Sequence, residues 1–223
     1  MLTAKLILER LDKQGRVLER REQKSRSFVL QFIELLYVAH AQIAAGAPFA
    51  MTDIGGNPRD IDSEMDDGRS GKSNLLIGSP PGSSQVICSY GQAIMNPDLP
   101  KLVVEGENVG IQVGTGTTAP TPTDIAIETR IAHGRGATEL EYGGCELIGI
   151  TFSDPNGEFT IRRYFTNASG GPITVNEVGM YSIGTDKGNG IWPFLVARDK
   201  VDPGVAVADG ELLRVTYVPQ ITV

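Results

Sequence analysis

The chain has 223 residues, of which 20 are basic and 27 acidic, giving a formal net charge of −7. This length allows one large domain with a sizeable core, or one domain with a small appendage. The acidic balance argues against a general nucleic-acid binder, which must neutralise phosphates with an excess of basic side chains. The 27 glycines and 13 prolines suit many short strands joined by turns.

The N-terminal ten residues lack the apolar core and the cleavage site of a signal peptide, so we expect the chain to be made in a cytoplasm. No uninterrupted apolar run reaches about 18 residues, so we expect no membrane span. Cys88 and Cys145 are the only cysteines, and neither belongs to a metal knuckle. Whether the two pair in a disulfide stays open.

Alternation of apolar and polar residues predicts a strand over 2–9, a turn over 13–16 and a charged return strand over 17–23. The period then changes to that of a helix over 27–44, with Ser25 or Ser27 as N-cap and with Gly46 and Pro48 ending it. This helix is apolar nearly all round, so we expect a sheet or another subunit to cover it. The interface candidates are Phe28, Phe32, Leu35, Leu36 and Ile43.

Residues 51–101 are rich in Gly, Ser, Pro and Asp, and we expect long loops with one or two strands. The segment Gly68–Ser73 ends like a phosphate-binding P-loop, but Asp66 stands where the first glycine is needed, which favours a solvated loop. The acidic residues nearby are weak candidates for a calcium site: Asp60, Asp62, Glu64 and Asp66. Gly68 arrives one position too late for an EF-hand, so a mobile acidic loop is the alternative.

Further strands are predicted over 102–104, 109–113, 125–127, 147–152, 191–198 and 212–218. The stretch 157–181 predicts two strands paired around a tight turn at 167–171. In the first arm Phe159, Ile161, Arg163 and Phe165 share a face, and in the second Ile173 and Val175 do. Turns are expected at Asp202–Gly204 and Asp209–Gly210.

The fold class that follows is mainly β: an antiparallel β-sandwich or jelly-roll-like domain with one N-terminal helix after a β-hairpin. We expect three parts: 1–50, the hairpin and helix, integrated with or docked on the main domain; 51–100, a loop-rich insertion; and 101–223, the sandwich.

No catalytic arrangement is indicated, and we expect neither an enzyme nor a cofactor. His40 and His133 are far apart and have no second ligand at metal spacing, so structural histidines are favoured. No nucleophile motif points to a Ser/His/Asp or Cys/His site. Paired carboxylates for glycoside chemistry stay open, but an aromatic content of 6% leaves few rings for a sugar platform, and Trp192 is expected in the core.

Four segments in this order carry a resemblance: residues 110–124 (GIQVGTGTTAPTPTD), 131–134 (IAHG), 165–181 (FTN to EVGMY) and 195–199 (LVARD). Together they resemble tailed-bacteriophage virion structural proteins, the β-sandwich accessory proteins of head, neck or tail. The resemblance covers 110–218 and extends weakly to 25–29. The piece Glu177–Tyr181 also resembles a short signature of tail-fibre and baseplate attachment domains.

The resemblance implies a virion protein, made in the host cytoplasm, that forms a homo-oligomer and docks on other capsid or tail proteins. A trimer is expected by analogy, and the position in the particle (head decoration, neck, tail or baseplate) stays open. One alternative is a host-surface or carbohydrate-binding adhesion module that uses the loops at 51–101. A third possibility is a β-fold enzyme acting on polysaccharide.

Overall fold

The computed structural model describes residues 2–25, 28–41, 48–61, 87–88, 91–94, 101–105, 109–153, 156–185 and 191–222. The elements within these residues are β1 (Leu2–Leu11), β2 (Val17–Ser25), α1 (Leu30–Ala41), β3 (Phe49–Thr52), β4 (Pro58–Ile61), β5 (Ile87–Cys88), β6 (Gly91–Ile94), β7 (Lys101–Glu105), β8 (Gly110–Gly114), β9 (Glu141–Ser153), β10 (Asn156–Thr166), β11 (Ile173–Thr185), β12 (Ile191–Val207) and β13 (Leu212–Thr222).

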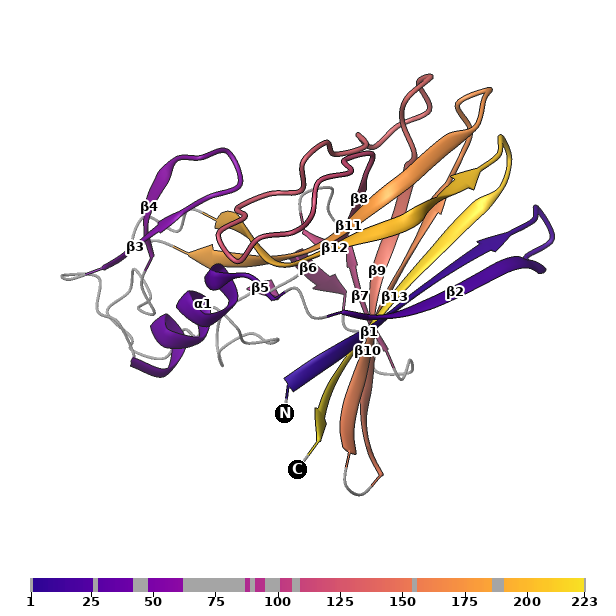
Figure 1. Ribbon diagram of the computed structural model, residues 1–223. Coiled ribbons are helices and arrows are strands. Elements are labelled where there is room, and N and C mark those ends of the chain that lie inside the picture. The colour runs from indigo at the N-terminus through magenta and orange to yellow at the C-terminus, as the bar shows by residue number, and fades with distance from the viewer. Residues whose placement is uncertain are drawn as a thin grey trace.

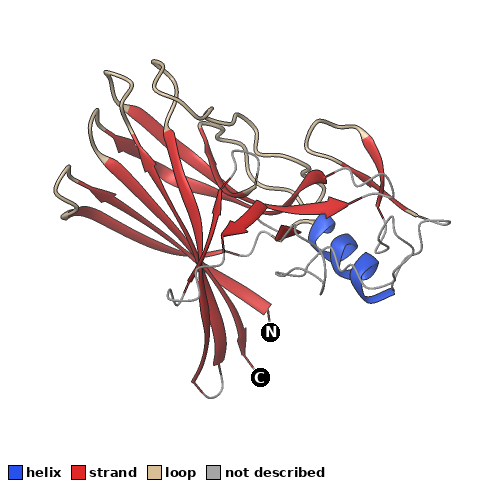
Figure 2. Ribbon diagram, turned by 180° about the vertical axis from the view of Figure 1, so that it is seen from behind, coloured by secondary structure: helices blue, strands red, loops and turns tan. Residues whose placement is uncertain are grey.

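The strands form a large sheet in the order β2-β1-β13-β10-β9-β7-β6-β5, a small sheet in the order β12-β11-β8, and the separate hairpin β3-β4. The small sheet lies across one face of the large sheet, while α1 and β3-β4 lie at one end of β12 (Figure 1). Seen from behind, the large sheet extends past the small one at the end where both termini lie (Figure 2).

One hydrophobic core fills the space between the two sheets. The large sheet supplies Leu6, Leu8, Ile161, Phe165, Leu213 and Val215, and the small sheet supplies Ile111, Val113, Val175, Val178, Phe194 and Val196. On β10 and β13 these side chains alternate with polar ones, whereas on β1 and β12 the intervening residues Ile7 and Leu195 are also apolar. The mainly β, antiparallel, sandwich-like fold with a helix after a β-hairpin is therefore confirmed, while the jelly-roll connectivity stays a prediction.

The predicted pairing of the two arms of 157–181 is wrong, although their faces were predicted correctly. β10 lies between β13 and β9 in the large sheet, and β11 lies between β12 and β8 in the small sheet. The turn at 167–171 therefore carries the chain from one sheet to the other. Ile161, Phe165, Ile173 and Val175 are buried as predicted, because both arms face the same core.

The N-terminal hairpin is confirmed: β1 pairs with β2, and Gly15 turns between them with φ 79°. β1 also pairs with β13, so the hairpin is part of the large sheet.

The predicted turn at Asp202–Gly204 does not end a strand, because β12 continues through it. Val175 pairs with Val205 and Glu177 with Lys200, so the extra residues of β12 bulge opposite Asn176. A Cβ on Gly204 would lie 1.9 Å from the Asn176 side-chain oxygen, which explains the glycine there.

The predicted strand at 125–127 is also not formed. These residues belong to a loop, residues 115–130, which we call the cover loop. The backbone amides of Ile127, Glu128 and Thr129 bond to side chains of β11 instead of to another strand. Side-chain acceptors thus replace the strand ladder, which the alternation of apolar residues does not reveal.

The helix begins at Leu30, three residues later than the predicted start at residue 27. Phe28 forms a bridge with Ala197 of β12, and the amide of Val29 donates to Val196 O, so both residues are still extended. Ser25 is not an N-cap: it ends β2, and its hydroxyl donates to the Asp199 carboxylate at 2.7 Å. Ser27 and residues 42–47 lie outside the described residues. Leu35 and Val38 enter the main core, which fixes the inner face of α1.

β12 is an edge strand of the small sheet, and side chains occupy its outer edge. Gln31 of α1 accepts from the Leu195 amide at 2.9 Å, and Gln23 of β2 donates to Lys200 O at 2.9 Å. Arg21 donates to Pro203 O. These bonds account for the burial of Gln31 and block the addition of another strand at this edge.

Candidate functional site

The acidic segment that sequence analysis singled out is mostly outside the described residues. Asp60 lies on β4 with its side chain exposed. Asp62, Glu64, Asp66 and the P-loop-like segment Gly68–Ser73 fall outside, as does most of the loop region assigned to an adhesion surface. In the part of the chain that is described, no three His, Cys, Asp or Glu side chains are placed to hold a metal ion.

The histidine and cysteine that the structure describes have structural surroundings. His133 Nδ1 accepts from the Tyr142 amide at 2.9 Å, and the two rings meet edge to face at 5.8 Å. Cys145 is a buried free thiol, so it forms no disulfide, and burial raises its pKa. A thiol in such surroundings is a poor nucleophile. Nothing is described of the side chains of His40 and Cys88.

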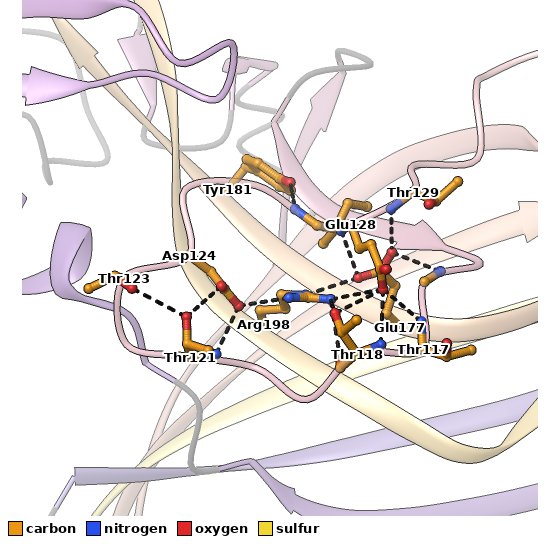
Figure 3. A network of polar contacts seen from close by, with 12 residues as sticks. Thr117, Thr118, Thr121, Thr123, Asp124, Glu128, Thr129, Glu177, Tyr181 and Arg198 are labelled. Carbon is orange, nitrogen blue, oxygen red and sulfur yellow. Dashed lines mark hydrogen bonds and ion pairs between the residues drawn. The ribbon is translucent and has the colours of Figure 1, made fainter.

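A cluster of charged side chains around the buried Glu177 and Arg198 is the strongest candidate site among the described residues. It consists of Asp124 and Glu128 from the cover loop, Glu177 from β11 and Arg198 from β12, and we call it the Arg198 cluster. Arg198 lies between Asp124 on one side and Glu177 with Glu128 on the other (Figure 3). Glu177 is 1% exposed and Arg198 4%, so both charges are taken out of water.

Glu177 holds both ends of the cover loop. One of its oxygens accepts from the amides of Gly116 at 3.0 Å and Thr129 at 2.8 Å. The other oxygen accepts from the Glu128 amide at 2.9 Å and from Arg198 Nε at 3.0 Å. A carboxylate has about four lone-pair sites, so its capacity is filled within the protein.

Arg198 joins the other carboxylates to Glu177. Its Nη1 donates to Asp124 at 2.7 Å, and its Nη2 donates to the Thr118 hydroxyl at 3.0 Å and lies 3.6 Å from Glu128. Burial alone would lower the pKa of Arg198, but its bonds to Asp124 and Glu177 outweigh that effect and raise it. The guanidinium is therefore a permanent cation at the centre of three acids.

Asp124 and Glu128 close turns within the cover loop. Asp124 accepts from the Thr121 amide at 2.9 Å and hydroxyl at 2.6 Å. Glu128 accepts from the amides of Thr117 at 2.8 Å and Thr118 at 2.9 Å. Each carboxylate thus organises the backbone that carries it, and Arg198 then fixes both turns to β12.

Two glycines make room for these carboxylates. A Cβ on Gly114 would lie 2.5 Å from a Glu177 oxygen, and one on Gly116 would lie 2.4 Å from it. A third glycine, Gly179, lets the cover loop approach the sheet, because a Cβ there would lie 2.5 Å from Ile127. The glycine spacing in the loop is therefore a packing requirement of the cluster.

Apolar contacts complete the attachment of the cover loop. Ile127 packs with Tyr181, Leu195 and Val29 in a second hydrophobic cluster on the outer face of the small sheet. The Tyr181 hydroxyl accepts from the Ile127 amide at 2.8 Å, and burial raises the Tyr181 pKa well above its ordinary value. The neutral phenol thus remains in place as an acceptor across the accessible pH range.

The Arg198 cluster holds the cover loop against β11 and β12. Its hydrogen-bonding groups are directed at the cover loop and at one another, and the Thr118 and Thr121 hydroxyls beside its carboxylates close turns of that loop. None of its four members is predicted as a site residue from the sequence patterns. One sequence signal could have pointed to the cluster: Gly114-Thr115-Gly116, Asp124, Glu177 and Arg198 all lie in the segments quoted for the resemblance.

The interface candidates on the helix mostly face inward. Leu35 is fully buried in the main core, and Phe28 and Phe32 pack against that core with their rings 4.8 Å apart. Leu36 is half-buried, and Ile43 lies outside the described residues. The large apolar side chains that face outward are instead Leu30, Ile33 and Tyr37.

The cover loop is expected to loosen in acid. Burial would raise the pKa of Asp124, but hydrogen bonds from Thr121 and Arg198 outweigh it and lower that pKa, and bonds from Thr118 lower the pKa of Glu128. A lowered folded-state pKa gives stability that is complete above the ordinary carboxyl range and lost as pH falls through the lowered value. We expect the melting temperature to drop below about pH 4.

Comparing melting temperatures between about pH 7 and about pH 3 in the wild type and in Asp124→Asn measures this contribution. The variant should start lower at neutral pH and lose less on acidification, because one of the titrating groups is gone. If the melting temperature fell by the same amount in both proteins between about pH 7 and about pH 3, a role for Asp124 ionisation would be contradicted.

None of the helices in the described residues has the length and apolar character to cross a bilayer. No protein-family model, curated protein or solved structure matches this chain, so the assignment of the site depends on its own geometry.

Proposed function

We propose that this chain is a structural protein of a tailed-bacteriophage virion, where its copies assemble with one another and dock on other capsid or tail proteins. The observation that carries the proposal is an apolar stripe on the outer face of α1. Leu30, Ile33 and Tyr37 are 51, 57 and 53% exposed. They follow the i, i+3, i+7 spacing of one helix face, which is the pattern by which a helix docks in a groove of a partner.

Neighbouring groups extend this outer stripe. The Tyr37 ring lies 5.4 Å from the ring of Phe49 on β3. Glu34 shares the face, and burial raises its pKa, so its surroundings are already partly apolar. A partner that covers the stripe must therefore donate a hydrogen bond to the Glu34 carboxylate, or Glu34 must be protonated in the complex.

The Arg198 cluster supports an assembly role in a second way. The segments that resemble virion proteins place their charged residues inside the protein, where they hold the cover loop. These residues make the protomer rigid, and a symmetric particle is built from repeated copies of one rigid protomer.

The test is the mass of the purified chain in solution by sedimentation. The wild type is expected to form a homo-oligomer, and the double variant Ile33→Lys, Tyr37→Ser is expected to shift to monomer with its melting temperature nearly unchanged, because both side chains are more than half exposed. Val17→Lys is a matched control, since Val17 is 48% exposed on β2, away from α1.

A monomeric wild type, or a double variant that keeps the oligomer, would overturn the role of the stripe. The virion context has a separate test, mass spectrometry of purified particles of the phage that encodes the chain. Absence of the chain from those particles would overturn that context.

A further inference from the structure

The first turn of α1 is tied to the cover loop by a hydrogen bond. The amide of Leu30, the first residue of the helix, donates to Pro122 O at 2.8 Å. The first amides of a helix have no partner within the helix and need one elsewhere. Val29, the residue before α1, has no side-chain acceptor, so the carbonyl of Pro122 takes the place of a side-chain cap.

The position of Pro122 depends on Asp124. The Thr121 amide and hydroxyl donate to the Asp124 carboxylate, and the Asp124 amide donates back to Thr121 O at 3.2 Å. Pro122 is inside this small turn. Because Arg198 Nη1 holds the same carboxylate at 2.7 Å, the turn and its Pro122 carbonyl are fixed relative to β12.

An apolar contact joins the same two segments. Val29, which immediately precedes α1, packs with Ile127 of the cover loop in the second hydrophobic cluster. The Val29 amide is held by Val196 O at 3.1 Å. The start of the helix is thus enclosed between β12 and the cover loop.

We propose that the cover loop is a latch for helix α1: while Arg198 holds Asp124, the Pro122 carbonyl and Ile127 fix the first turn of the helix, and loss of the Arg198–Asp124 pair releases loop and helix start together. Through this latch the Arg198 cluster sets the orientation of the outer stripe of α1. That last consequence rests on the assembly role proposed above, whereas the coupling between loop and helix does not.

The test is amide hydrogen exchange on the full chain at neutral pH, followed by mass spectrometry. Asp124→Asn is expected to speed exchange about tenfold in peptides that cover 116–123 and, equally, in peptides that cover 28–34, since bonds to a charged group are lost. Peptides from β10 and β13 should keep the wild-type rates.

Asp12→Asn is the matched control. Like Asp124, Asp12 accepts from an arginine side chain, and it also accepts the backbone amides of Gln14 and Arg16, but it lies in the turn between β1 and β2. Its substitution should speed exchange only near that turn. Faster exchange in the cover loop with unchanged rates in 28–34, or no change in either, would overturn the latch.

Two further measurements keep the test decisive. If Asp124→Asn does not fold, Thr121→Val removes one donor to the Asp124 carboxylate at an exposed position and should change the same two peptides to a smaller degree. Repeating the exchange in the Ile33→Lys, Tyr37→Ser background removes assembly as a cause. If, in that background, Asp124→Asn still speeds exchange in both peptides and the double variant keeps the oligomeric mass of the wild type, the latch is supported and the assembly surface is overturned.

Discussion

Replacing Glu177 with alanine is expected to lower the free energy of unfolding by about 3–5 kcal/mol. The substitution leaves the backbone amides of Gly116, Glu128 and Thr129 without their acceptor and removes one of the carboxylates that hold Arg198. Burial prevents water from replacing these bonds, because Glu177 is 1% exposed. Urea unfolding followed by circular dichroism measures the loss as a shift in midpoint at constant slope.

Two variants separate this effect from a general cost of losing a charge. Glu22→Ala removes an ion pair with Arg20 at the exposed face of β2 and should cost less than about 1 kcal/mol. Glu177→Gln keeps the shape but turns donors toward the backbone amides, so it should also be strongly destabilising. Equal midpoints for Glu177→Ala and Glu22→Ala would show that the cover loop does not depend on Glu177.

Asn167→Ala is the second substitution with a large expected effect, a loss of about 3 kcal/mol. Asn167 is fully buried where the chain passes from the large to the small sheet. Its side-chain amide donates to Gly171 O at 2.8 Å and to Val207 O at 2.7 Å. Its side-chain oxygen accepts from the amide of Ser169 at 3.0 Å. Alanine removes all three bonds and leaves Gly171 O only the Ser169 hydroxyl as a donor, and thermal or urea unfolding measures the result.

Asn57→Ala is the control for this prediction, because Asn57 is an exposed turn residue whose side chain makes one long bond, 3.3 Å, to Asp53. Its loss should stay within about 0.5 kcal/mol. Asn167→Asp should resemble the alanine variant or be worse, since it buries a carboxylate that has no positive charge to pair with. If Asn167→Asp were as stable as the wild type, the turn between the two sheets would not need the two hydrogen bonds that the Asn167 side chain donates.

Both predictions concern segments that the proposal of a virion protein draws on. Residues 110–124 and 195–199 contribute Asp124 and Arg198 to one cluster, and 165–181 contributes Asn167 and Glu177. These residues are brought together by folding, and in this chain they build the cover loop and the corner between the sheets. Such motifs therefore describe a way of folding more directly than they describe a binding site.

The strands and their buried faces could be predicted from the sequence because alternation is a local property. Phe165 and Val175 are in the core for the reason that their spacing indicates, and the turn glycines Gly15, Gly170 and Gly210 have positive φ. The outward stripe of α1 could not be located in the same way. A helix that is apolar on every side gives no pattern from which its exposed face can be read.

The sequence by itself determined most of the strands and the faces they bury, but it also predicted a strand at 125–127 that does not form and a turn at Asp202–Gly204 that lies inside β12. Only the tertiary structure decided that β10 pairs with β13 while β11 joins another sheet, and that Glu177 meets Gly116, 61 positions away, and Arg198 meets Asp124, 74 positions away. The reason is physical: local pattern fixes which side of a strand is apolar, but a buried charge must find its partners in space, wherever along the chain they occur.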